Sequence, residues 1–304
     1  MQIHSATIML TDFCNLQCPH CYKKSINSVC NLDKVKSFIK ENDIRLIKIF
    51  GGEPLLPCYF DTLKELTDFC DINKISYFAQ SNLTFELSED LLNIIKKFCK
   101  FGTSFNFRRW KNKKQYDLWI ENSKKVLEIK DTYCLCTLDV DMISKEPEYV
   151  FNLLKNDLPF KNYCFDMYVG DNKPNNKDVD EWLCKYYLLE RETDNLNIMF
   201  KMIIGSFTNR PITYRFTNKC FNNSYIFHTD GHITFCPMID IDISTGKDKL
   251  EEMFKLDETC KNCKWLGVCH GVCPLLKHDE NYCKGYPKLF EIIKQDIDNR
   301  YINI

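Results

Sequence analysis

Residues 11–22 of the chain read Thr-Asp-Phe-Cys-Asn-Leu-Gln-Cys-Pro-His-Cys-Tyr, which places Cys14, Cys18 and Cys21 in a C-x3-C-x2-C spacing. Three thiolates this close together can bind one metal centre, although a structural zinc ion or an iron–sulfur cluster usually takes four protein ligands. One interpretation is a zinc knuckle that His20 or a remote cysteine completes. The other is an iron–sulfur cluster with one iron open to a substrate or cofactor.

The flanking sequence predicts that this stretch is a loop after a first strand. Residues 6–10 form an apolar run typical of a short buried strand, and residues 30–42 have the pattern of a helix. A second motif follows the next expected strand, where residues 44–50 run directly into Gly-Gly-Glu-Pro at 51–54. In a barrel of alternating strands and helices, this end of the strands carries the chemistry.

Together the two motifs resemble the signature of the radical S-adenosylmethionine (SAM) enzymes. The resemblance implies that Cys14, Cys18 and Cys21 hold a [4Fe–4S] cluster whose fourth iron is chelated by SAM. It also implies that one electron cleaves SAM into methionine and a 5′-deoxyadenosyl radical, which abstracts hydrogen from a substrate. Contacts with SAM are implied for His20, Gly51, Gly52, Glu53 and Pro54. These residue types fit, because glycine admits a ligand close to the backbone and a carboxylate accepts from an ammonium group.

The pattern of strands and helices continues along the chain. We expect strands at 75–80, 103–107, 133–138 and 163–169, and helices at 58–73, 87–100, 116–130, 147–155 and 178–190. Six strand–helix pairs predict an α/β fold with parallel strands and right-handed crossovers. This suits the partial (β/α)6 barrel of the radical SAM family over residues 1–192. A bridge at 193–215 would follow.

Two polar residues and one basic stretch lie near the expected strand ends. The resemblance places Asn82, after the third strand, and Ser104, on the fourth, at positions that often contact SAM, although such residues are also common caps. The fifth strand carries no arginine, where related enzymes often hold the SAM carboxylate. Residues 108–114, Arg-Arg-Trp-Lys-Asn-Lys-Lys, follow the fourth strand. They would grip an acidic peptide or a phosphate, or form a solvated loop before a helix.

The last third of the chain carries a second set of cysteines: Cys220, Cys236, Cys260, Cys263, Cys269, Cys273 and Cys283. Their spacing, with Gly231, resembles the SPASM domain, an extension of radical SAM enzymes that binds two auxiliary [4Fe–4S] clusters. We expect this domain, with a C-terminal helix, at 216–304; a pair of zinc fingers is the alternative. Asp-Gly at 230–231 predicts a hairpin over residues 227–235, with His228 and His232 exposed beside its turn.

The resemblance divides these cysteines between two clusters. Auxiliary cluster I would take Cys220, Cys236 and Cys273. Auxiliary cluster II would take Cys260, Cys263, Cys269 and Cys283. Many relatives complete cluster I with a cysteine about six residues before the first, but Tyr214 stands there. Either a remote residue supplies the fourth ligand, or one iron is open and can bind a substrate thiol.

Composition excludes several classes of protein. A chain that is 44% hydrophobic and 27% charged is globular, and a net charge of −1 gives no general attraction to nucleic acid or acidic membranes. No apolar run is long enough to span a membrane, and no signal-peptide pattern is seen, so we expect a cytoplasmic protein. Eighteen cysteines then favour metal over disulfides and an anaerobic setting. Most of the eight cysteines outside the motifs, such as Cys70 and Cys99, are expected to be buried.

The resemblance favours a radical SAM maturase that forms a thioether or carbon–carbon cross-link in a ribosomally made peptide, and an open iron in cluster I favours a substrate that contains cysteine. Its electron donor would be a flavodoxin or ferredoxin. An anaerobic sulfatase-maturating enzyme is the alternative, although such enzymes usually carry Asp directly after the second SPASM cysteine, where Pro237 stands. Peptide epimerisation, small-molecule oxidation and a non-catalytic electron-transfer or sensor protein also stay open. Because the first strand begins near Met1, we expect any leader to be recognised by the barrel rim, the bridge or another protein.

Overall fold

The computed structural model describes residues 4–23, 25–170, 173–208, 224–239, 241–244, 246–253, 255–273, 275–276, 278–279 and 281–302. The chain divides into two compact units. The first unit comprises residues 1–134 and 220–250, and the second comprises residues 135–219 and 251–304. The units therefore differ from the expected limits at 192 and 216, which stay predictions. Cys220 lies outside the described residues.

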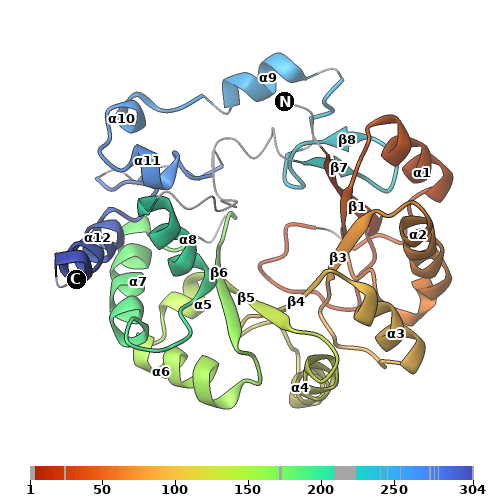
Figure 1. Cartoon of the computed structure of the whole chain (residues 1–304), viewed down its shortest axis with the longest axis horizontal. Coiled ribbons are helices and arrows are strands. Elements are labelled where there is room, and N and C mark those ends of the chain that lie inside the picture. The colour runs from red at the N-terminus through yellow and green to blue at the C-terminus, as the bar shows by residue number, and fades with distance from the viewer. Residues whose placement is uncertain are drawn as a thin grey trace. The chain divides into compact units, whose positions relative to one another are not determined.

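The first unit is a mostly parallel sheet with helices on its outside (Figure 1). Its elements are β1 (Ser5–Thr11), α1 (Leu32–Glu41), β2 (Leu46–Gly51), η1 (Pro57–Tyr59), α2 (Phe60–Ile72), β3 (Ser76–Gln80), α3 (Glu89–Lys97), β4 (Lys100–Phe105), α4 (Lys113–Leu127), the start of β5 (Thr132–Leu138), β7 (Tyr225–Phe227), β8 (Ile233–Thr234) and α9 (Lys247–Met253), which continues into the second unit. The strand order is β5-β4-β3-β2-β1-β7-β8. The expected alternation of strands and helices is confirmed.

The strands of this sheet are held by their burial and their register. β1 has six buried residues in succession, as expected for a central parallel strand covered on both faces. Its Ile8 is level with Ile49 of β2 and with Phe227 of β7. β7 runs parallel to β1 and pairs in antiparallel with β8, so the expected hairpin joins the same sheet. Gly231 has φ +94° at the hairpin turn, a conformation that favours glycine.

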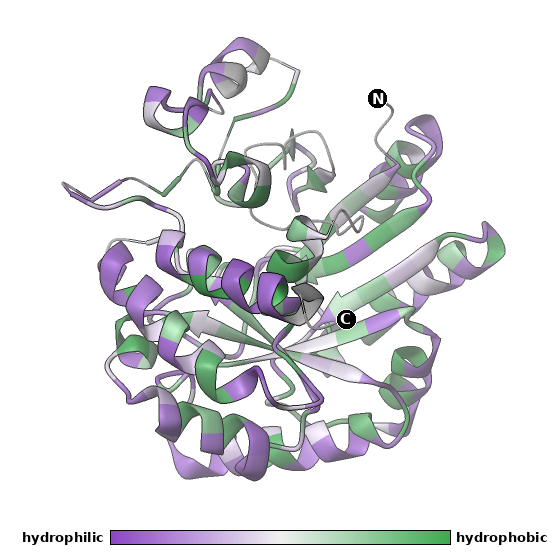
Figure 2. Ribbon diagram, turned by 60° about the vertical axis from the view of Figure 1, so that its left-hand side comes forward, coloured by the Kyte–Doolittle hydropathy of each residue, from purple (hydrophilic) through white to green (hydrophobic). Residues whose placement is uncertain are grey.

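The helices of the first unit are amphipathic. α1 buries Val35, Phe38 and Ile39, and α3 buries four apolar residues on one face. Asn31 and Ser88 cap these helices, since each side chain accepts a backbone N–H three residues on. Figure 2 shows the resulting mixture of hydrophilic and hydrophobic residues along the helices.

The second unit packs helices around the end of β5 and β6. Its elements are α5 (Val140–Ile143), α6 (Pro147–Asn152), η2 (Leu153–Asp157), β6 (Asn162–Met167), α7 (Asn176–Glu190), α8 (Ile198–Phe207), α10 (Glu258–Lys261), α11 (Leu266–Cys269) and α12 (Pro287–Ile302). β6 lies beside β5. α8 falls within residues 193–215, so the expected bridge contains a helix. α12 is the expected C-terminal helix.

A buried carboxylate ties α7 to the last part of the chain. Asp180 is fully buried and accepts hydrogen bonds from the hydroxyl of Tyr282 at 2.6 Å and from the backbone N–H groups of Lys288 at 2.9 Å and Leu289 at 3.0 Å. The last two residues begin α12. Burial raises the pKa of Asp180 against the effect of these donors. Asp180 therefore fixes the start of α12 on α7.

The cysteines outside the motifs are mostly buried, as expected. Those in the core are Cys30, Cys70, Cys134, Cys136, Cys164 and Cys184. Cys58 and Cys99 are exposed, so the expectation for Cys99 was wrong. Cys99 lies between α3 and β4, and the neighbouring Phe98 takes the buried position instead. Among the residues described, no helix combines the length and apolar character that a membrane crossing requires.

Candidate functional site

The first three cysteines lie on the loop that leaves β1. The backbone N–H of Cys21 donates to the carbonyl of Cys18 at 3.0 Å, and the N–H of Cys14 donates to the hydroxyl of Ser25 at 2.9 Å. Cys14 interacts electrostatically with Cys18, and Cys18 with Cys21. Burial raises the pKa of Cys14 to about 11, so a nearby cation or metal is needed to stabilise its thiolate. The structure thus brings the three predicted ligands together.

The glycines at 51 and 52 pack against the backbone of this cysteine loop. Gly52 donates its N–H to the carbonyl of Thr11 at 2.7 Å, and Glu53 donates to that of Phe13 at 2.8 Å. A Cβ on Gly51 would lie 2.1 Å from the Thr11 oxygen, and one on Gly52 would lie 2.1 Å from the Phe13 oxygen. Both positions therefore exclude any side chain. The second motif fixes the cysteine loop by direct backbone contact.

Glu53 joins the end of β2 to the loop after β3. Its carboxylate is buried and accepts hydrogen bonds from the N–H of Leu55 at 3.1 Å, the hydroxyl of Ser81 at 2.8 Å and the N–H of Asn82 at 2.5 Å. Burial raises the pKa of Glu53 to about 7, and these donors oppose the rise. The structure gives Glu53 a role as a buried brace, and its predicted contact with an ammonium group stays a prediction.

Asn82 connects the same brace to the cysteine loop. Its side-chain N–H groups donate to Asn15 at 2.8 Å and reach the sulfur of Cys14 at 3.7 Å. Asn15 in turn donates to the carbonyl of Thr84 at 2.6 Å. Asn82 is buried. Asn82, one of the two polar residues predicted to contact SAM, therefore lies beside the predicted cluster ligand Cys14.

Arg109 is the residue of this site that the sequence did not single out. It is 9% exposed, and its Nη1 donates to the carbonyl of Ser104 at 3.0 Å and to the Ser104 hydroxyl. Its Nε is buried and has no hydrogen-bond partner among the described residues. The guanidinium interacts electrostatically with Cys14, Cys18 and Glu53. The site therefore holds a buried cation whose Nε–H is available to donate to a ligand.

The remainder of the basic stretch behaves differently from Arg109. Residues 111–114 are exposed, and α4 begins at Lys113, which fits the interpretation of a solvated loop with a helix start. The chain turns back at Arg109, whose N–H donates to the carbonyl of Asn106 at 3.2 Å. The sequence did hold one sign of Arg109. The fifth strand lacks the arginine that often binds the SAM carboxylate in related enzymes, so another cation was needed for that role.

The hairpin of β7 and β8 meets the cysteine loop within the first unit. Burial would raise the pKa of Asp12, but hydrogen bonds from Lys23, Thr229 and Ser28 hold it below the usual value. Thr229 belongs to the hairpin turn. A cavity of about 350 Å³ opens here, lined by residues of both segments, among them Asp12, Lys23, His228, Thr229, Pro237 and Met238.

One expectation for this hairpin was wrong. His228 was expected to be exposed, yet it is buried and shares a hydrogen bond of 2.9 Å with the Thr234 hydroxyl. Its ring stacks on that of His232, with centroids 4.0 Å apart and planes at 8°. Burial, with His232 and Lys23 nearby, lowers the pKa of His228 to about 4. The parallel pairing of β7 with β1 carries His228 inward.

Four of the later cysteines gather in the second unit. Cys260, Cys263, Cys269 and Cys283 interact electrostatically with one another. Burial raises the pKa of Cys269 to about 11. Gly285 lies between two of them, since a Cβ there would be 3.7 Å from the Cys283 sulfur and 3.9 Å from Cys269 Cβ. The donor set predicted for auxiliary cluster II is therefore present in one place.

Backbone N–H groups donate to five of the ten predicted ligand sulfurs. Residues two positions further on donate to Cys14 at 3.4 Å, Cys236 at 3.5 Å, Cys263 at 3.4 Å, Cys269 at 3.5 Å and Cys283 at 3.3 Å. Hydrogen bonds to sulfur stabilise thiolates and tune iron–sulfur clusters. The local geometry therefore fits metal-bound sulfur at the motif positions.

The set predicted for auxiliary cluster I is not brought together by the described residues. Cys220 lies outside them, Cys236 belongs to the first unit and Cys273 to the second. Burial raises the pKa of Cys273, while the N–H groups of Leu275 and Leu276 oppose the rise. This cluster and its fourth ligand stay predictions.

Comparison with known proteins supports the fold. No family model matches the chain. Over 63 residues it is 35% identical to GTP 3',8-cyclase of Alkaliphilus metalliredigens (strain QYMF), which covers 18% of this chain and only about a fifth of that relative (20%). Native anSMEcpe with bound AdoMet aligns at a TM-score of 0.76 and 16% identity over 98% of both chains. Streptococcus suis SuiB aligns at 0.57 and 15% identity, over 91% of this chain and 76% of SuiB. The chain thus has the α/β fold of radical SAM enzymes with a SPASM domain.

Proposed function

We propose that the chain is a radical SAM enzyme that modifies a peptide or protein. The observation that carries this proposal is the joint placement of Cys14, Cys18 and Cys21 against the glycine motif and Arg109. Three thiol ligands leave a cluster iron open, and the buried guanidinium beside them suits the carboxylate of an amino-acid group. SAM presents such a group together with an amine.

Different residues of the first unit would hold the cluster, bind SAM and keep the cysteine loop in place. Cys14, Cys18 and Cys21 would hold a [4Fe–4S] cluster, and Arg109 would donate from Nε to the SAM carboxylate. Asn82 and Glu53 would keep the cysteine loop and the strand ends in place. His20 and Ser104 stay proposed SAM contacts. When bound, the cluster and SAM supply a 5′-deoxyadenosyl radical that removes hydrogen from a substrate.

Peptide substrates are supported by the structural neighbours. Structures of anSMEcpe with the Cp18Cys peptide and of SuiB with precursor peptide SuiA have the same fold as this chain. The cavity beside the cysteine loop, with Cys236 next to its lining residue Pro237, offers room for a peptide side chain. The finer proposal is a maturase that forms a thioether or carbon–carbon cross-link in a ribosomally made peptide. A flavodoxin or ferredoxin partner would supply the electron that cleaves SAM. The auxiliary clusters would accept the electron that the substrate radical loses when the cross-link forms.

Sulfatase maturation is the second candidate, favoured by the alignment with anSMEcpe over 98% of both chains. Pro237 directly after Cys236 counts against it, because sulfatase-maturating enzymes usually carry an aspartate there. The two candidates differ in product: oxidation to formylglycine alters one residue, whereas a cross-link joins two residues of the peptide.

An anaerobic experiment tests the proposal in two steps. First, the reconstituted protein is assayed for iron, sulfide and zinc, then reduced with dithionite and given SAM, and 5′-deoxyadenosine is measured by mass spectrometry. We expect about twelve irons for three clusters and SAM cleavage that the Cys14→Ala, Cys18→Ala, Cys21→Ala triple variant lacks. Zinc in place of iron, or no cleavage by fully loaded protein, would contradict the proposal.

The second step separates the two candidate reactions. A cysteine-containing sulfatase peptide and cysteine-rich short peptides are each incubated with the active enzyme and analysed by tandem mass spectrometry. A cross-link lowers the mass of the peptide by two hydrogens, and the two linked residues stay in one fragment after proteolysis. Formylglycine on the sulfatase peptide would favour the second candidate instead.

A further inference from the structure

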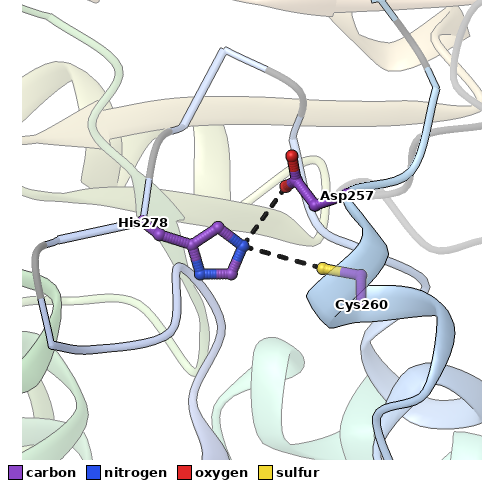
Figure 3. Close-up of side chains that lie close together, drawn as sticks. All are labelled: Asp257, Cys260 and His278. Carbon is purple, nitrogen blue, oxygen red and sulfur yellow. Dashed lines mark hydrogen bonds and ion pairs between the residues drawn. The ribbon is translucent and has the colours of Figure 1, made fainter.

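His278 lies against one of the thiols of the second unit (Figure 3). Its Nε2 is 3.8 Å from the sulfur of Cys260 and 3.2 Å from Oδ2 of Asp257. One donor atom from each of the three residues falls within 4.8 Å of the others. Two interpretations follow: the three residues bind a metal ion of their own, or His278 donates a hydrogen bond to a sulfur that belongs to a cluster.

The other ring nitrogen decides between these interpretations. The backbone N–H of Lys284 donates to Nδ1 of His278 at 3.4 Å. A nitrogen that accepts carries no proton, so in the neutral ring the proton is assigned to Nε2. Nε2 is then a donor and has no lone pair for a metal. The tautomer therefore favours a hydrogen bond from His278 over a separate metal site.

The neighbouring charges hold the ring in this orientation. The single Nε2 proton is shared between the Cys260 sulfur at 3.8 Å and Oδ2 of Asp257 at 3.2 Å, and Asp257 also pairs with the ammonium group of Lys284 at 2.9 Å. Lys284 is 8% exposed and directly follows Cys283. Lys284 thus contacts His278 through its backbone and Asp257 through its side chain. Both ring nitrogens are engaged, which fixes the ring beside Cys260.

The contact completes a pattern among the four thiols. Cys263, Cys269 and Cys283 each accept a backbone N–H from the residue two positions further on. For Cys260, the donor is the ring of His278. Every sulfur of the set then has one N–H donor. Donors to cluster sulfurs stabilise the more negative, reduced state and raise the reduction potential.

We propose that His278 is a positioning residue that donates from Nε2 to the sulfur of Cys260 and thereby raises the potential of the cluster held by Cys260, Cys263, Cys269 and Cys283. This inference rests on the proposed function, since it requires a cluster at these thiols. It assigns the group of Asp257, His278 and Lys284 to the tuning of that cluster.

The test compares two substitutions of His278 by redox titration followed with electron paramagnetic resonance. The protein is reconstituted in the background that lacks Cys14, Cys18 and Cys21, so that the SAM cluster does not contribute to the signal. His278→Phe removes the donor, whereas His278→Gln keeps an N–H of similar reach. We expect the ratio of reduced to oxidised cluster at a fixed potential to fall about tenfold with Phe, or about 59 mV for one electron, and less with Gln. His4→Phe, at an exposed histidine of the first unit, is the control.

Each outcome has a distinct meaning. Equal potentials in this background protein with His278 and with His278→Phe, at equal iron content, would overturn the role of His278 while leaving the proposed function intact. Loss of a cluster from His278→Gln would show that the ring is a ligand and would also overturn it. Zinc bound in place of iron by the wild-type chain would contradict both proposals together.

Discussion

Replacing Glu53 by Gln is expected to change the stability of the metal-free protein by an amount that depends on pH. Burial raises the pKa of Glu53 to about 7 from a usual value of 4.5. The folded protein thus binds this proton more tightly than the unfolded chain. The stabilising effect of the proton is complete below the lower value and is lost as pH rises through the higher one. Across that window the shift corresponds to roughly 3 kcal/mol of unfolding free energy.

Glutamine does not titrate, so its contribution is the same at every pH. In either orientation its amide NH2 would face a backbone N–H, that of Asn82 or that of Leu55. This mismatch of two donors destabilises the variant equally at each pH and cancels in the comparison. Between pH 5.5 and pH 8, the variant should therefore gain roughly 2 kcal/mol relative to wild type.

The measurement is anaerobic urea unfolding of the metal-free protein with a thiol reductant, followed by tryptophan fluorescence at both pH values. Glu86→Gln, at an exposed carboxylate in the same unit, is the matched control and should show little relative change. An equal difference between Glu53→Gln and wild type at the two pH values would refute the reasoning. So would a variant that loses stability relative to wild type as the pH rises.

Three further substitutions test other parts of the structure. Arg109→Met should raise the Kd for SAM more than tenfold in equilibrium dialysis with the oxidised cluster, because a charge-assisted contact is worth roughly 1.5–3 kcal/mol; Arg109→Lys should recover part of the affinity, and an unchanged Kd in Met would contradict the assignment. Gly52→Ala should lower the iron content, because its Cβ would lie 2.1 Å from a backbone oxygen of the cysteine loop, whereas Gly267→Ala, which meets nothing within 4 Å, should bind iron normally. Asp180→Ala should lower the free energy of unfolding by roughly 3 kcal/mol, since three donors lose their acceptor, and a loss no larger than that of exposed Asp178→Ala would count against it.

Periodicity was enough to predict the sheet but not every helix. The buried parallel strands read as apolar runs, which makes segments such as residues 44–50 recognisable from sequence. α8 was missed because its residues, Ile-Met-Phe-Lys-Met-Ile-Ile-Gly-Ser-Phe, are apolar around most of the helix and show little amphipathic period. Its cap was a readable signal, because Asn197 accepts the N–H of Met199.

Sequence spacing pointed to the candidate ligands, but it gave no sign of the contacts that depend on packing. The cysteine spacings and the glycine motif pointed to two loops that the structure brings into contact. That both glycines lie against the backbone of residues 11–13 could not be read from the sequence, because it depends on how two distant loops meet. The burial of Arg109 within an exposed basic stretch, and of His228 beside a turn, likewise results from contacts made in three dimensions.

The pairing of β7 with β1 sets an order of events during synthesis. β1 ends at Thr11, and its partner on one side, β2, is complete by Gly51, whereas β7 ends at Phe227. Synthesis proceeds at roughly 5–20 residues per second. The edge of β1 that pairs with β7 therefore stays unpaired for about 10 to 45 s, until β7 has been synthesised. During that time an apolar strand presents unpaired N–H and C=O groups to other chains. A nascent chain of this protein is therefore a natural client for chaperones, and shortened versions that end before Tyr225 would keep that edge open permanently.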